Sequence, residues 1–177
     1  MRKLNAIISA AIVVIFLIHG VMGGFMLLGI GKGAGQPLAW LGVGLIAVHT
    51  VLGAVFSLKS IRASKAGGWR FRQNALFWAR RASGICILVF AFFHIDLFGH
   101  EAEGTYLLLD FTTAKLALQM LLILSLFTHI FMNIRPLLVS LGIIGGKEKR
   151  LDVFVALSLI LLFCAGAVLA YYAGWKT

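Results

Sequence analysis

The chain has 177 residues, of which 61% are hydrophobic and only 12% are charged. Soluble domains average about 45–50% apolar and about 25% charged residues, so this composition excludes an ordinary soluble domain and indicates an integral membrane protein. The formal net charge of +10 does not indicate nucleic-acid binding, because the basic residues gather in the links between apolar runs. The two cysteines, Cys86 and Cys164, lie in apolar runs without the spacing of a disulfide framework, zinc site or c-type haem motif.

Five apolar runs are each long enough to cross a hydrocarbon core of about 30 Å, which takes about 20 helical residues. They cover roughly residues 5–30, 38–58, 81–99, 113–139 and 153–174. Because lipid offers no hydrogen-bond partner to a free backbone group, each run is expected to be helical. The sequence therefore predicts an all-α integral membrane protein, with five transmembrane helices in a single domain that covers residues 1–177.

The basic residues are divided unequally between the two sets of links. All but three of the 16 lysines and arginines lie on the side that also holds the N-terminus, and the exceptions are Lys32, Lys115 and Lys176. Cytoplasmic links carry this excess in membrane proteins. We therefore expect a multi-pass protein of a bacterial-type inner (cytoplasmic) membrane, with its N-terminus in the cytoplasm and its C-terminus outside.

The stretch 62–80 on the cytoplasmic side mixes arginines with aromatic residues: Trp69, Phe71, Phe77 and Trp78. This mixture is typical of an amphipathic helix that lies in the membrane interface. Two readings remain open for its role, a solvated basic loop and a docking surface for an extrinsic subunit.

Four of the five histidines lie in apolar runs, one in each of the first four: His19, His49, His94 and His129. An imidazole is costly in hydrocarbon, so an intramembrane histidine indicates a function. At 1.5 Å per residue, His19 and His94 share nearly the same depth, and His49 and His129 lie nearer the cytoplasm. We therefore predict that four helices form a bundle that binds two haems b, with His19 and His94 on the outer iron and His49 and His129 on the inner iron. The alternative is interhelical hydrogen bonding, which is the more common role of a lone intramembrane histidine.

Polar residues at the ends of the spans are candidate partners for the haem propionates: Arg81, Ser83 and Arg135 for the inner haem and Lys115 for the outer one. Interfacial basic residues are also expected without any cofactor. Glycines would leave room for a porphyrin face, such as Gly20 and Gly24 close to His19 in the chain and Gly84 at the start of the third span. Ordinary close packing between membrane helices explains such glycines equally well.

Asp96, two residues after His94, is the only acid well inside a predicted span, and His100 follows at the outer boundary. Quinol oxidation releases protons, so titratable groups near a haem edge suit quinone or proton handling. Asp96 and His100 are the candidates for this catalytic role. The alternative is an interfacial polar cluster in which Asp96 pairs with Lys115 or with a helix end.

Two segments carry a resemblance to a known family. Residues 74–94 (NALFWARRASGICILVFAFFH) resemble the (Q/R)R-x-(S/T)-G…H stretch of succinate:quinone oxidoreductase cytochrome b subunits, and residues 129–143 (HIFMNIRPLLVSLGI) resemble their H-x-x-x-(N/G)-G-(L/I)-(R/W) stretch. The resemblance covers roughly residues 74–170, and the first two spans match by histidine placement alone. In family members with five spans and two haems b, the first and third histidines pair at the distal haem, and the second and fourth pair at the proximal haem.

The resemblance implies a membrane-anchor subunit of a succinate dehydrogenase or quinol:fumarate reductase. Its partners would be an FAD flavoprotein subunit and an iron–sulfur subunit on the cytoplasmic face, and membrane quinone (menaquinone or ubiquinone) would be the substrate. Dicarboxylate chemistry is assigned to those partners, because this chain has no flavin motif and no cysteine cluster. Phe127 stands where some di-haem members carry a carboxylate, two residues before the fourth-span histidine.

Two other classes of function remain open. One is a di-haem b subunit of a hydrogenase or formate dehydrogenase. The other is a small membrane transporter or structural protein without haem, in which the histidines serve packing and the purified protein is colourless.

Overall fold

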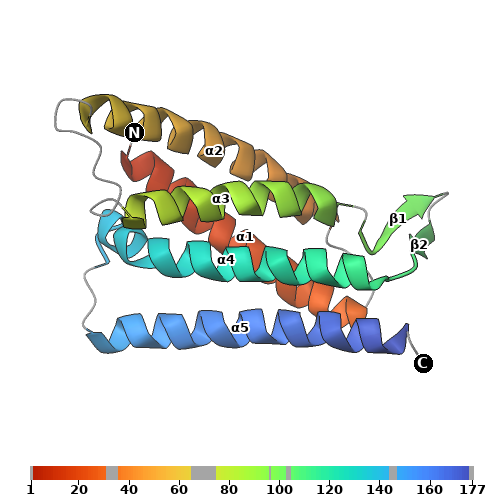
Figure 1. Ribbon diagram of the computed structural model, residues 1–177. Coiled ribbons are helices and arrows are strands. Elements are labelled where there is room, and N and C mark those ends of the chain that lie inside the picture. The colour runs from red at the N-terminus through yellow and green to blue at the C-terminus, as the bar shows by residue number, and fades with distance from the viewer. Residues whose placement is uncertain are drawn as a thin grey trace.

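The computed structural model describes residues 2–30, 36–64, 75–95, 97–102, 105–143 and 147–175. Five long helices run back and forth along one direction (Figure 1), namely α1 (Arg2–Leu27), α2 (Gln36–Ser64), α3 (Ala75–His94), α4 (Thr113–Ser140) and α5 (Lys147–Gly174). Each of them contains a segment that is long and apolar enough to cross a membrane. The predicted all-α membrane class with five spans is confirmed.

The largest difference from the predicted spans is in α3, which covers residues 75–94 instead of 81–99. The helix includes Arg80 and Arg81 because their guanidinium groups reach acceptors on α4 and α2. It ends before Leu97 and Phe98, which are buried in a cluster with Phe111 beyond the helix. Hydropathy cannot separate an apolar residue that extends a span from one that packs in a folded link.

That link contains a short antiparallel hairpin where the sequence predicts only a connection. Its strands are β1 (Gly99–Ala102) and β2 (Thr105–Leu108), with Gly99 opposite Leu108. The Leu109 amide donates to the Phe98 carbonyl at 2.9 Å and extends the ladder. The Phe98 ring stacks on Phe111 with the centroids 5.1 Å apart, which fixes the hairpin against the ends of α3 and α4.

Helices α1 and α4 end in the same way. Each is followed by a glycine in the left-handed region, Gly29 at φ +76° and Gly142 at φ +78°. The amide of the next residue then donates to a carbonyl five residues earlier, Ile30 to Phe25 at 2.9 Å and Ile143 to Leu138 at 3.0 Å. This is the Schellman arrangement, in which glycine avoids the steric penalty of positive φ and the last carbonyls find donors inside the membrane-spanning chain.

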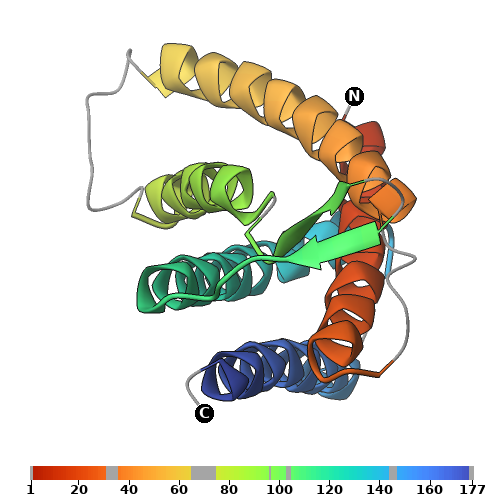
Figure 2. The same cartoon turned by 90° about the vertical axis from the view of Figure 1, so that its right-hand side faces the viewer.

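The helices are packed unevenly around the bundle. α1 contacts α2, α4 and α5, and α4 also contacts α3 and α5 (Figure 2). Among the described helices, no Cα of α2 lies within 8 Å of a Cα of α3, α4 or α5. Packed helices have axes about 8–10 Å apart, so α2 lies farther from α3 and α4 than a directly packed neighbour would.

Buried apolar side chains concentrate on α4, α5 and the hairpin link. One cluster includes Phe111, Leu161 and Val168, and a second consists of Ile130, Ile134 and Leu157. Within the described parts of α2 and α3, no apolar side chain is buried. The side of the bundle that these two helices form is therefore not closed by an apolar core.

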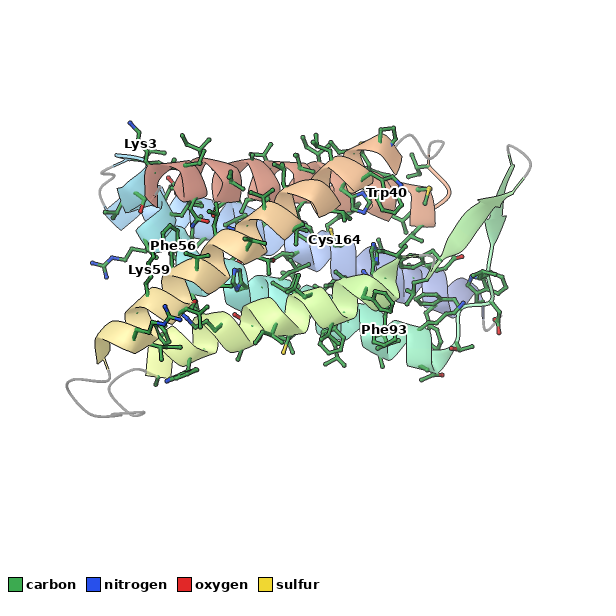
Figure 3. The ribbon with its side chains drawn as sticks, turned by 90° about the horizontal axis from the view of Figure 1, so that it is seen from above. Lys3, Trp40, Phe56, Lys59, Phe93 and Cys164 are labelled. Atoms are coloured by element: carbon green, nitrogen blue, oxygen red, sulfur yellow. The ribbon has the colours of Figure 1, made fainter. Side chains whose placement is uncertain are left out.

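The two ends of the bundle differ in charge. The end where α1 begins and α2 ends carries the basic side chains that the structure describes there: Lys3, Lys59, Arg62, Arg80, Arg81 and Arg135. We call it the basic end, and Lys3 and Lys59 mark it in Figure 3, with Trp40 and Phe93 toward the opposite end. We call that opposite end, which carries β1 and β2, the hairpin end. The prediction that the basic end faces the cytoplasm stays a prediction.

Candidate functional site: two pairs of intramembrane histidines

His19 and His94 meet in the half of the bundle nearer the hairpin end. Their ring centroids lie 6.1 Å apart and the ring planes are 86° apart, nearly perpendicular. His19 comes from α1 and His94 is the last residue of α3, two helices that have no Cα pair within 8 Å. The rings therefore bridge a separation that the backbones do not close, and the structure brings together the two residues predicted as the outer pair.

His49 and His129 form the second pair, from α2 and α4. These two helices have no Cα pair within 8 Å, so any meeting of the two residues is between side chains. On α3, Gly84 lies beside His129, since a Cβ built on this glycine would stand 3.3 Å from Cε1 of the ring. The absence of a side chain at this position lets the imidazole lie against the α3 backbone.

The two pairs lie at separate levels of the bundle. On α4, Gln119 contacts His94 and marks the outer level, and His129 follows ten residues later, about 15 Å along the helix at 1.5 Å per residue. On α1, Ser9 contacts His49, and His19 follows after another ten residues, again about 15 Å. Two helices thus give the same separation.

His94 is held by a buried amide. Its Nδ1 lies 2.8 Å from Oε1 of Gln119, whose side chain is only 8% exposed. An amide oxygen only accepts, so the imidazole donates from Nδ1. In a neutral ring this leaves Nε2 with its lone pair.

His49 is held by a serine hydroxyl that has already used its own proton. Ser9 Oγ donates to the Asn5 carbonyl at 2.7 Å and lies 3.2 Å from Nδ1 of His49. When its single proton is on the Asn5 carbonyl, the hydroxyl accepts from Nδ1 of His49. In that arrangement Nε2 of a neutral His49 keeps its lone pair.

His129 has the same arrangement on the other side of the bundle. The hydroxyl of Ser83, which is buried, donates to the Arg80 carbonyl at 3.1 Å and lies 3.0 Å from Nδ1 of His129. Three of the four imidazoles therefore have Nδ1 engaged by a polar side chain, which leaves Nε2 as the nitrogen that could meet a metal. Metal-bound histidines almost always donate their other ring N–H to such a partner.

The outer histidine pair has the spacing of a bis-histidine metal centre of the haem type. An imidazole nitrogen binds a metal at about 2 Å and lies about 1.1 Å from its ring centre, so two axial imidazoles have ring centres about 6.2 Å apart. The 6.1 Å between His19 and His94 agrees with this spacing. In the described part of the chain, no group of three or more His, Cys, Asp or Glu could hold a metal ion. Paired imidazoles suit a metal whose other ligands come from a macrocycle, as in haem proteins.

The predicted propionate partners are placed as follows. Arg81 reaches from α3 to Ser57 on α2, and Ser83 is engaged by His129. Arg135 is exposed on α4 toward the basic end. Lys115 lies at the hairpin end, where its Nζ donates to the Asp110 carbonyl at 2.6 Å. Each of the four therefore lies toward the end of the bundle that the sequence analysis assigns to it.

The candidates for quinone or proton handling are only partly described. Asp96 lies outside the described residues, and for His100 the structure gives the backbone, which pairs with Leu107 across the hairpin. In the link that follows α3, the ring of Phe98 lies near His94, with the two ring centroids 5.8 Å apart. Of the interfacial stretch 62–80, residues 65–74 lie outside the described part, and the rest belongs to α2 and α3.

The glycines have two different roles. A Cβ on Gly20 would stand 3.1 Å from Sγ of Cys164, and one on Gly24 would stand 2.6 Å from Cε1 of Phe163. Both glycines therefore seat α5 against α1. The interpretation of these two as space for a porphyrin is not supported, and that role remains open for Gly84, which faces His129.

Ser9 and Gln119, the hydrogen-bond partners of His49 and His94, are not among the residues predicted from the sequence. Each is a polar residue inside an apolar run, and each shares a level of the bundle with a histidine on another helix. The depth comparison that pairs the histidines could therefore also have indicated that Ser9 lies at the level of His49 and Gln119 at the level of His94.

Comparison with protein-family models, curated proteins and solved structures gives no match for this chain. The structure itself shows five helices that are long and apolar enough to span a membrane, with His19 and His94 paired ring to ring and His49 and His129 at a second level. Hydrogen bonds through Nδ1 orient three of the four rings.

Proposed function

We propose that the chain is a membrane cytochrome b with two haems, serving as the anchor and electron-transfer subunit of a succinate dehydrogenase or fumarate reductase. The observation that carries the proposal is the outer histidine pair, whose rings are spaced like two axial ligands of one metal. His94 in this pair already donates its Nδ1 proton to Gln119. A haem bound at such a pair supplies reversible one-electron transfer at its iron.

The chain contributes the ligands, their orientation and a dry environment. His19 and His94 present nitrogen donors from α1 and α3, and His49 and His129 present them from α2 and α4. Gln119, Ser9 and Ser83 fix the ring orientation by accepting the Nδ1 protons, at distances of 2.8, 3.2 and 3.0 Å. The surrounding apolar helices exclude water, which protects a bound cofactor from unwanted proton and oxygen chemistry.

Histidines that served only helix packing would also form hydrogen bonds, so their presence alone does not favour a ligand role. Two features do. The three bonds all use Nδ1 and so leave the same nitrogen for a metal. In addition, α2 and α3 bury no apolar side chain in their described parts, although each carries a histidine directed at another helix.

In this proposal the extrinsic iron–sulfur and flavoprotein subunits dock at the basic end, on the cytoplasmic side of a bacterial inner membrane. Support comes from the excess of basic residues there and from the resemblance of residues 74–170 to succinate:quinone oxidoreductase subunits. Quinone would react near the outer histidine pair, with Asp96 and His100 as the candidate proton-handling groups.

The test is the haem content and absorption spectrum of the purified protein. We expect about two b-type haems per chain in the wild type, and about one after His19→Ala or after His129→Ala. Cys86→Ala, which removes an exposed side chain from α3, is the matched control and should keep both haems. A colourless wild-type protein from haem-replete cells would overturn the proposal.

A second measurement identifies the electron donor. In membranes that contain the assembled complex, succinate should reduce the haems without any other electron donor. Reduction by hydrogen or formate, and not by succinate, would instead assign the chain to a hydrogenase or formate dehydrogenase.

A further inference from the structure

Gln119 is one of two polar side chains that are buried among the described residues, and both of them contact a histidine. Gln119 is 8% exposed and contacts His94, and Ser83 is 7% exposed and contacts His129. Burying an amide in an apolar bundle is costly unless its polar atoms find partners. The 2.8 Å contact with Nδ1 supplies such a partner to the amide oxygen.

This contact affects the other side of the imidazole ring. When Nδ1–H donates to a strong acceptor, electron density rises across the ring and Nε2 becomes a better donor to a metal. A stronger donor favours the oxidised, more positively charged metal over the reduced one. Hydrogen bonding around the ligands is one of the means by which a protein tunes a haem potential.

We propose that Gln119 is a positioning residue that lowers the redox potential of the outer haem by accepting the Nδ1 proton of His94. Ser83 has the same relation to His129 at the inner level. This inference rests on the proposed function, because it needs a haem at the His19–His94 pair. At each level of the bundle a different hydrogen bond to Nδ1 then sets the redox potential, one to an amide for the outer haem and one to a hydroxyl for the inner haem.

The two contacts can be separated because they lie on different helices and at different levels. Gln119→Leu removes the acceptor from His94 and leaves a side chain of similar volume. Ser83→Ala removes the acceptor from His129. Thr128→Val is the matched control on α4, since the Thr128 hydroxyl donates only to the Leu124 carbonyl of its own helix.

The first arm of the test is a redox titration of the purified, haem-loaded protein, followed by absorption. Gln119→Leu should raise the potential of one of the two transitions, by about 59 mV if the ferric–ferrous equilibrium changes tenfold. Ser83→Ala should raise the other transition, and Thr128→Val should move neither. Two unchanged transitions in Gln119→Leu, or the same transition moved by Gln119→Leu and Ser83→Ala, would overturn the inference.

The second arm uses haem-free protein and does not depend on the proposed function. In protein with ¹⁵N-labelled histidine, one ring should show a protonated, hydrogen-bonded Nδ1 that changes in Gln119→Leu and is unaffected by Thr128→Val. No change in any ring would refute the contact itself. A change in this arm combined with a chain that never binds haem would refute the proposed function and leave the Gln119 contact standing.

Discussion

Arg81, in the second turn of α3, donates from Nε to the Ser57 hydroxyl of α2 at 3.0 Å, although no Cα pair of these helices lies within 8 Å. The same guanidinium donates from Nη1 to the Phe77 carbonyl at 2.8 Å and lies 3.2 Å from the centre of the Phe77 ring. Because Phe77 holds the arginine in place, its long side chain can bridge two helices that do not pack directly.

We expect Arg81→Ala to lower the stability of the protein by about 1–2 kcal/mol, because it removes a charge-assisted hydrogen bond that is partly exposed. Ser57→Ala should cost less, because a small hydroxyl is lost. Thermal unfolding in detergent gives both values. The double variant should show a coupling of about 0.5–1 kcal/mol if the two groups interact, and strictly additive losses would contradict the bridge.

Two adjacent glycines on α1 provide a matched pair of tests for the α1–α5 contact. Gly24→Ala should destabilise the protein by about 1–3 kcal/mol, since its Cβ would stand 2.6 Å from the Phe163 ring and force a shift. Gly23→Ala meets nothing within 4 Å and should be neutral or stabilise the helix by about 0.5–1 kcal/mol. Equal melting temperatures for the two variants would show that α5 does not pack on α1 as described.

Gly84→Val should displace the His129 ring, because the Cβ of the valine alone would lie 3.3 Å from Cε1 of His129. Under the proposed function, the purified variant should contain about one haem per chain, and its remaining haem should respond to Gln119→Leu. Gly166→Ala on α5, where nothing lies within 4 Å, should keep two. Full haem content in the Gly84→Val protein would show that the inner haem does not depend on a His129 ring lying against Gly84.

Haem depletion should lower the melting temperature of the wild-type protein. A ligand that binds only the folded state adds about 2.7 kcal/mol at a free concentration 100 times its dissociation constant. The effect should be large here because no apolar side chain is buried in the described parts of α2 and α3. The double variant His94→Ala/His129→Ala should melt at the same temperature with or without haem, and a wild type that behaves like it would contradict the prediction.

Much of the fold could be predicted from the sequence because hydropathy and helix rise are local properties. The same rise that sets span length also placed His19 beside His94, which the structure finds 6.1 Å apart. The ends of α3 could not be predicted this way. Arg80 and Arg81 belong to the helix because their side chains reach acceptors on α4 and α2. Leu97 is apolar because it packs in a buried cluster outside the helix and not because it extends the span.

The depth of Ser9 and Gln119 could be read from the sequence, but their contacts with the histidines could not. Gln119 and His94 are 25 residues apart in the chain, and Ser9 and His49 are 40 apart. Their contacts depend on the rotation of one helix about its axis relative to another. Near-uniform apolar sequences give little information about that rotation, because lipid-facing and helix-facing positions have similar composition.

The wide spacing between α2 and α3 also bears on what joins this flank of the bundle. No Cα of α2 lies within 8 Å of a Cα of α3, so side-chain contacts such as the one from Arg81 to Ser57 join the two helices. This flank therefore depends on individual side chains more than the flank between α3 and α4 does, where the backbones pack directly.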